Sequence, residues 1–146
     1  MPATADPFTL AMVDALKAEA TLLANLAKYP ENGAPAVFAD AVPRDARAPW
    51  VLVADVSEVE GAGSKTRSGR DILRDITVIT DAETDTGSLA TQLAHAVRLL
   101  FHRSTSLAVP GFATLLVHVV LGPAVAPTDE RLRGRLVSVR VVLTPP

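Results

Sequence analysis

The chain has 146 residues, of which 49% are hydrophobic, and it carries a formal net charge of -2 with no cysteine. This length fits one domain over residues 1–146 with a core of ordinary size. The lack of cysteine excludes disulfides, thiolate nucleophiles and cysteine-ligated metal sites. The slightly acidic balance excludes nucleic-acid binding by bulk positive charge. We therefore expect a function that depends on local features of a single domain.

The apolar stretches of the chain are too short or too charged for a membrane. The N-terminal stretch contains Asp14, Lys17 and Glu19, so we expect neither a signal peptide nor a membrane anchor. The uncharged stretch Ser104 to Thr128 is interrupted by proline and glycine, and its apolar part is Phe112 to Leu121. That part has about half of the roughly 20 residues that a spanning helix needs. It is predicted to form a buried strand.

Residues 8–28 are predicted to form an amphipathic helix, because their apolar residues recur at spacings of three and four. Asp6 and Pro7 suit the N-cap and the first helical position. Tyr29-Pro30 and Asn32-Gly33 should end the helix, since proline disfavours helix in its predecessor and Asn-Gly favours a turn. The apolar stripe consists of Leu10, Val13, Leu16, Ala20, Leu23 and Leu26 or Ala27.

The middle of the chain is predicted to form a β-hairpin. A short strand, Ala36 to Ala39, precedes it, and the hairpin strands are Trp50 to Glu58 and Arg70 to Thr80, joined by the loop Val59 to Gly69. Both alternating sets of residues at the start of the first strand are apolar, which indicates cover on both faces there. The second strand places apolar residues on one face, which we expect to be mostly buried. That face carries Ile72, Ile76 and Val78 together with Arg74.

The second half of the chain is predicted to form a helix and a second hairpin. Thr84 or Asp85 can cap the helix, Leu89 to Leu100 carries its apolar stripe, and His102 and Arg103 complement its dipole. The last two strands are Phe112 to Leu121 and Arg135 to Leu143. One face of the final strand carries Arg135, Val137, Val139, Val141 and Leu143. The predicted order is helix, short strand, hairpin, helix, hairpin.

The first hairpin loop contains Gly61-Ala62-Gly63-Ser64-Lys65-Thr66, a composition similar to a phosphate-binding P-loop. The spacing differs, because that motif needs glycine at the positions that Ser64 and Val59 occupy. The loop also leads into a strand, so no helix N-terminus is available to hold the anion. We interpret the segment as a hairpin tip and not as a nucleotide site.

The segment from Asp81 to Gln92 partly matches a calcium-binding loop. Asp81, Glu83 and Asp85 alternate like the first ligands of such a loop. Thr86 stands where the turn glycine belongs, and Gln92 stands where the bidentate glutamate belongs. We interpret the segment as a solvated turn and helix cap.

The three histidines do not match a shared metal site. His95 and His102 are seven residues apart, which is about 10.5 Å along a helix, whereas a metal-binding pair needs closer spacing. His118 lies in an apolar segment and is predicted to be a hydrogen-bonded residue of the sheet. The sequence also lacks a G-x-S-x-G elbow. We expect no enzyme, and no catalytic, cofactor-binding or metal residues.

Lys65, Arg67 and Arg70 form a local basic cluster, which Arg74 continues along the strand. Its functional interpretation is contact with an acidic partner or DNA, and the alternative is a solvated hairpin. RNA recognition by stacked aromatic residues is not expected, because aromatic residues make up only 4% of the chain.

The order and pattern of these segments resemble the tail terminator, or tail completion, proteins of long-tailed bacteriophages. That family includes lambda-type minor tail protein U and its relatives in prophages and gene transfer agents. The resemblance covers nearly the full chain. It rests on Val13 to Leu26, Val37-Phe38, Val42-Pro43, Pro49-Trp50-Val51-Leu52-Val53, Ile72 to Thr80, Leu89 to Leu100, and Thr128-Asp129-Glu130-Arg131-Leu132-Arg133 before a terminal strand.

The resemblance implies an α+β fold in which a mixed or antiparallel β-sheet carries two α-helices packed on one face. It implies a homo-hexameric ring that caps the tail tube protein, stops tube growth and meets the head–tail connector or stopper protein. The location it implies is the head-proximal end of the virion tail, after assembly in the host cytoplasm. No membrane or sequence-specific nucleic acid is implied as a partner, although DNA can pass through the ring.

By the same resemblance, the loop Val59 to Gly69 reaches toward a neighbouring subunit or the tube. The loop Gly122 to Arg133 is a second contact. The first loop has no aromatic anchor, which leaves open whether it is an energetic hot spot or an adapter. The candidate interface residues are Gly61, Gly63, Lys65, Arg67, Arg70, Asp129, Arg131 and Arg133.

Two other classes of function stay open at this point. One is a ferredoxin-like module that binds a small ligand or RNA, which predicts aromatic or basic residues grouped on one sheet face. The other is a small enzyme that uses Asp55, Asp75 or the histidines.

Overall fold

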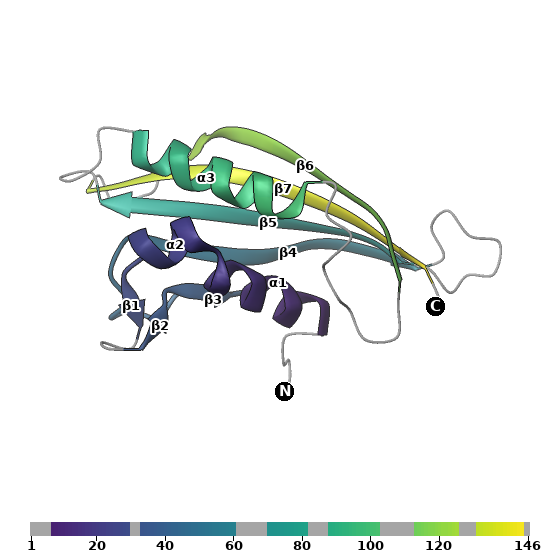
Figure 1. Cartoon of the computed structure of the whole chain (residues 1–146), viewed down its shortest axis with the longest axis horizontal. Helices are drawn as coiled ribbons and strands as arrows, with labels where there is room; N and C mark the ends of the chain where they lie inside the picture. Colours follow the sequence, from purple (N-terminus) through teal and green to yellow (C-terminus); the bar gives the residue numbers. More distant parts are fainter. Residues whose placement is uncertain are drawn as a thin grey trace.

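The computed structural model describes residues 7–29, 33–60, 70–81, 88–102, 113–125 and 131–144. In these residues, three helices lie on one face of a five-stranded sheet, and a two-stranded sheet lies beside them (Figure 1). The predicted α+β class is confirmed. The helices are α1 (Pro7–Ala18), α2 (Ala20–Asn25) and α3 (Ser88–Phe101). The strands are β1 (Lys28–Tyr29), β2 (Ala34–Pro35), β3 (Val37–Ala39), β4 (Trp50–Glu60), β5 (Arg70–Asp81), β6 (Ala113–Val125) and β7 (Leu132–Thr144).

The single helix predicted over residues 8–28 is two helices. Glu19 separates them in an extended conformation, with φ -69° and ψ 129°, and its carboxylate accepts a 2.8 Å hydrogen bond from the Leu22 amide. This bond satisfies one of the free amides at the start of α2, so the break is stabilised by a cap. The second helix ends at Asn25, and Lys28–Tyr29 then pairs with Ala34–Pro35 as a short antiparallel ladder. The predicted end at Tyr29 was therefore too late.

The large sheet has the strand order β3-β4-β5-β7-β6. Both predicted hairpins are present, and β5 and β7 join them as an antiparallel pair in the centre of the sheet. The β3 strand pairs with β4 in parallel. The predicted loop Gly122 to Arg133 is shorter than expected, because β6 continues to Val125 and β7 begins at Leu132. A register shift between Leu121 and Ala124 accommodates Pro123, which an edge strand can carry.

The core lies between the sheet and the helices. The buried face of β5 is the predicted one, and the alternating valines of β7 lie on the same side. The core includes Met12, Leu16, Ile72, Ile76, Val78, Leu93, Val97, Phe101, Val137, Val139 and Val141. None of the helices in the described ranges is long and apolar enough to cross a bilayer.

Arg74 is buried within this face, with 2% of its surface exposed. Its guanidinium donates a 3.2 Å hydrogen bond to the Leu73 carbonyl, and in the β4–β5 register Arg74 stands opposite Asp55. The predicted face of Arg74 is confirmed. Its predicted role as a continuation of the exposed basic cluster is wrong, because a buried guanidinium cannot contact a partner.

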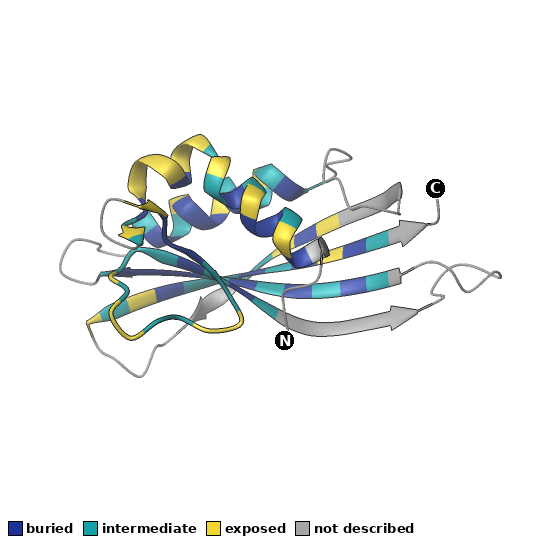
Figure 2. Cartoon of the chain, turned by 90° about the horizontal axis from the view of Figure 1, so that it is seen from below, coloured by how far each residue is buried: buried dark blue, intermediate teal, exposed yellow. Residues whose placement is uncertain are grey.

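The other face of the sheet has no helix over it in the described part of the chain (Figure 2). Trp50, Leu52 and Ala54 lie on this face and are half-buried, whereas Val51 and Val53 are fully buried under the helices. The sequence predicted cover on both faces of β4. The described helices cover only the face that carries Val51 and Val53. An apolar half-exposed sheet face is a surface suited to contact with another protein.

Candidate assembly interface

The predicted contact residues lie at two opposite ends of the sheet. At one end, which we call the Trp50 end, Trp50 pairs with Ile79 and Ile79 pairs with Gly134. At the other, which we call the Glu60 end, Glu60 pairs with Arg70. The 11 residues of β4 separate the two ends by roughly 33 Å. The helices cover the sheet from the Trp50 end, and the paired ends of β4 and β5 extend beyond them (Figure 1).

The structure places three of the eight predicted interface residues. Arg70 begins β5 at the Glu60 end, whereas Arg131 and Arg133 lie exposed at the Trp50 end. The two predicted contact regions are therefore not brought together within one copy of the chain. The other five lie outside the described residues: Gly61, Gly63, Lys65, Arg67 and Asp129.

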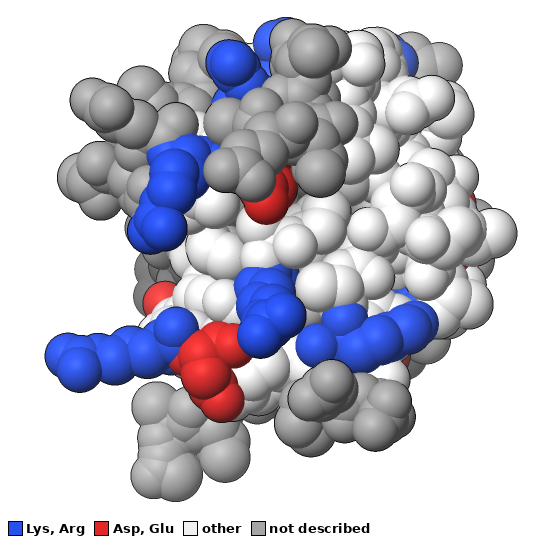
Figure 3. Space-filling view, turned by 90° about the vertical axis from the view of Figure 1, so that its left-hand side faces the viewer, with Lys and Arg blue, Asp and Glu red and all other residues white. Residues whose placement is uncertain are grey.

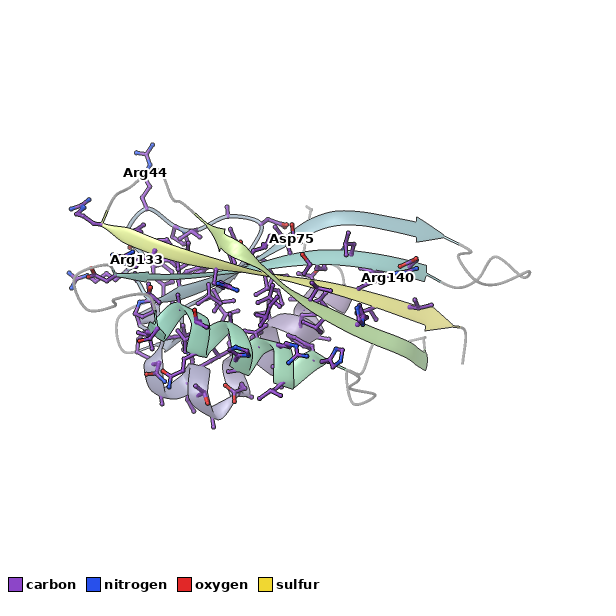
Figure 4. The ribbon with its side chains drawn as sticks, turned by 90° about the horizontal axis from the view of Figure 1, so that it is seen from above. Arg44, Asp75, Arg133 and Arg140 are labelled. Carbon is purple, nitrogen blue, oxygen red and sulfur yellow. The ribbon has the colours of Figure 1, made fainter. Side chains whose placement is uncertain are left out.

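A hollow of about 510 Å³ opens at the Trp50 end, and we call it the arginine hollow. Arg131, directly before β7, and Arg44 and Arg47, from the β3–β4 connection, are among the residues that line it. Figure 4 shows Arg44 and Arg133 projecting from this same end, and Figure 3 shows several separate groups of Lys and Arg atoms on it, with Asp or Glu atoms beside some of them. The lining residues are Arg44, Ala46, Arg47, Ala48, Trp50, Asp81, Arg131 and Leu132.

The β3–β4 connection is held in place by Tyr29. The Tyr29 hydroxyl bonds the Asp45 carboxylate at 2.9 Å, and its ring packs edge-on against Phe38 with centroids 5.3 Å apart. The hydrogen bond to Asp45 raises the pKa of Tyr29, and burial and the carboxylate charge act in the same direction. The Ala27 amide also donates to the Pro49 carbonyl at 3.0 Å. Arg44 and Arg47 therefore project from a tethered segment.

Sequence reasoning missed Arg44 and Arg47 because the segment before Trp50 has the composition of a turn. The available signal was two arginines three residues apart, directly before the single tryptophan of the chain. Arginine and tryptophan are both enriched in protein interfaces. The sequence did not show that Arg44 and Arg47 lie beside the start of β7 in the folded chain.

The uncovered sheet face carries a polar cross-strand cluster between apolar residues. Arg140 donates two hydrogen bonds to the Asp71 carboxylate, at 3.0 and 2.6 Å, and Ser138 donates to Asp75 at 2.9 Å. Asp75, one of the enzyme candidates, is therefore bonded to a neighbouring strand. The half-buried or exposed apolar residues on the face are Trp50, Leu52, Ala54, Leu73, Val120, Leu136 and Val142.

The Asp71–Arg140 pair should stabilise the folded state at neutral pH and lose this effect in acid. Arg140 lowers the pKa of Asp71, chiefly through its hydrogen bonds and further through its charge. A lowered pKa in the folded state stabilises the fold above the ordinary Asp pKa of about 3.9, and this contribution is lost as pH falls through the folded value. We expect Asp71→Asn to lower the melting temperature at pH 7, with the difference from wild type shrinking as pH falls below the ordinary Asp range. Asp14→Asn, at an exposed position of α1, is the control, and an equal loss in both variants would contradict the prediction.

Two of the three histidines meet at the edge of the sheet. The rings of His102 and His118 lie 5.5 Å apart, and Nδ1 of His102 accepts a 3.2 Å hydrogen bond from the Val119 amide. His95 lies exposed on α3. Since His102 uses Nδ1 as an acceptor, it joins the end of α3 to the edge strand β6. Among the described residues, no group of three or more His, Asp or Glu side chains could hold a metal ion.

Comparisons with solved structures give a likeness that covers nearly the whole chain. No family model and no curated protein matches the chain. A search of solved structures finds similarity to a chain in the virion of a native gene transfer agent (GTA) particle. The two chains are 25% identical, the likeness covers 92% of each, and the TM-score is 0.69. The likeness supports a structural virion protein. It holds over nearly the full length of both chains.

Proposed function

We propose that the chain is a ring-forming tail terminator of a phage or gene transfer agent particle. In this role, a homo-hexamer caps the last ring of tail tube protein, stops tube polymerisation and joins the tail to the head connector. The observation that supports it most is the full-length likeness to a chain of a gene transfer agent virion. Apart from the division of the first helix into α1 and α2 and the added β1–β2 pair, the order of helices and strands is the one on which the tail terminator resemblance rests.

The surface of the described chain is compatible with a subunit of a ring. One sheet face is left without helix cover, and exposed arginines stand at one end of the sheet. A ring requires that each copy use two different surfaces, because contacts between unlike surfaces close into a cycle when the rotation between copies allows it. Surfaces at opposite ends of one sheet meet this requirement. The proposed activity is geometric and assigns no catalytic residue.

The proposal is tested with the purified chain and the tail tube protein of the same genome. We expect light scattering to show that tube polymerisation stops when the chain is added, and electron micrographs to show rings at one end of the tubes. Tubes that grow equally long with and without the chain, together with a protein that stays monomeric under all conditions, would sink the idea.

A further inference from the structure

The outer edge of β6 has no strand beside it in the described part of the chain. β6 is the last strand in the order β3-β4-β5-β7-β6, and β7 pairs with its inner side. A free strand edge presents backbone amides and carbonyls to which a strand of another molecule can pair. Folded proteins therefore block such edges with side chains or covering segments. In this chain, His102 lies against the outer edge of β6.

His102 contacts this edge through a hydrogen bond from the backbone. The Val119 amide donates to Nδ1 of His102 at 3.2 Å, whereas Val139 of β7 is the cross-strand neighbour of Val119 on the inner side. The amide that reaches the imidazole is therefore directed away from β7. An added strand would lie about 4.8 Å from β6. The imidazole stands in the space that the backbone of such a strand would need.

The imidazole is held in this position by the end of α3. The His102 amide donates to the Arg98 carbonyl at 2.8 Å, which continues the last turn of the helix. The preceding residue, Phe101, is buried in the core. The helix itself packs over β7 and β6 (Figure 1). The bond to Val119 therefore links an anchored helix end to the edge strand.

The bond requires that Nδ1 of His102 carry no proton. An unperturbed imidazole gains its second proton near pH 6.5, and both ring nitrogens are then donors. The Val119 amide and Nδ1 are two facing donors in that state, so the bond is lost. The stabilising contact is complete above the imidazole range and disappears as pH falls through it.

The charged groups around the ring act in the same direction. The His118 ring on β6 lies 5.5 Å from the His102 ring, and it also gains a proton in acid. Arg98 is one turn earlier on α3, and Arg140 of β7 stands opposite His118 and is paired with Asp71. Protonation of His102 adds a positive charge beside these cations, which disfavours the closed arrangement further.

We infer that His102 is a pH-sensitive guard of the β6 edge. The neutral imidazole closes the edge to strand addition, and protonation in mildly acidic solution opens it. The closed edge keeps separate copies of the chain from pairing through β6. The guard does not depend on the proposed terminator role, because it involves one edge of a single copy.

Hydrogen exchange of the Val119 amide, followed by nuclear magnetic resonance, tests the bond. Relative to the rate in an unstructured peptide, exchange should become at least about fivefold faster between pH 7 and pH 5, the factor that corresponds to one ordinary hydrogen bond. His102→Asn keeps an acceptor that does not titrate, and should protect Val119 equally at both pH values. His102→Leu removes the acceptor and should speed the exchange of Val119 at pH 7.

His95→Leu is the matched control, because His95 lies exposed on the same helix. This variant should match the wild type at both pH values. Equal exchange of Val119 in the wild type and in His102→Leu at pH 7 overturns the inference. Exchange in the wild type that does not respond to pH, or a response that His102→Asn retains, overturns it as well.

Sedimentation at pH 7 tests whether the guard closes the edge. His102→Leu should self-associate at a concentration at least about threefold lower than the wild type, because its β6 edge is open. His102→Asn should stay closer to the wild type, and a cooperative melting transition verifies that each variant is folded. Equal self-association of the wild type and His102→Leu overturns the guard. If these differences hold but tube growth does not stop in the test above, the terminator role fails and the guard stands.

Discussion

We expect that deleting residues 61–69 and joining Glu60 to Arg70 through Asn-Gly leaves a folded protein that lacks the proposed ability to end tail-tube growth. The last pair of the β4–β5 ladder is Glu60 opposite Arg70, which is the geometry that a two-residue hairpin turn closes. The deleted sequence, GAGSKTRSG, has almost no apolar surface, so its removal takes nothing from the core. We expect the melting temperature to change by only a few degrees.

The loss of function should show in the length of the tails. Particles assembled with the deletion variant are expected to carry overlong tails in electron micrographs, and the yield of functional particles should fall at least about a hundredfold. A full-length control carries Lys65→Ser and Arg67→Ser, which remove the charge of the loop and keep its length. Comparing it with the deletion variant shows which of the two the function requires. Normal tails from the deletion variant would show that this loop is dispensable.

Replacing Phe101 with alanine should remove a large part of the stability of the fold. Phe101 is the last residue of α3 and is 1% exposed within the core. Truncation of a buried Phe to Ala costs about 3 to 5 kcal/mol, because apolar contact is lost and a cavity remains. A domain of this kind has about 5 to 15 kcal/mol in total. The measurement is the free energy of unfolding from urea titration.

Leu99 provides the matched control for Phe101 on the same helix. Its side chain is 76% exposed, so Leu99→Ala should change the free energy of unfolding by no more than about 0.5 kcal/mol. A Phe101→Ala cost below about 1 kcal/mol, or equal costs at the two positions, would show that the end of α3 is not packed as described.

The sequence alone determined the elements whose signals are local. The hydrophobic period of 3.6 residues predicted α3, and strict alternation predicted the buried faces of β5 and β7, because these periods follow from backbone geometry. The hairpin of β4 and β5 was predictable for the same reason, as two alternating segments joined by a glycine-rich loop. The face on which Arg74 lies was correct as well, although its burial was not recognised.

The tertiary structure decided everything that depends on which segments meet. The β5–β7 pair joins residues more than 50 positions apart, such as Ile76 and Val137, and no local pattern identifies a partner at that distance. The break at Glu19 depended on a cap that competes with helix propensity. The arginine hollow exists only because the β3–β4 connection and the start of β7 arrive at one end of the sheet. Charge along a sequence is visible residue by residue, but its concentration into a surface is a property of the fold.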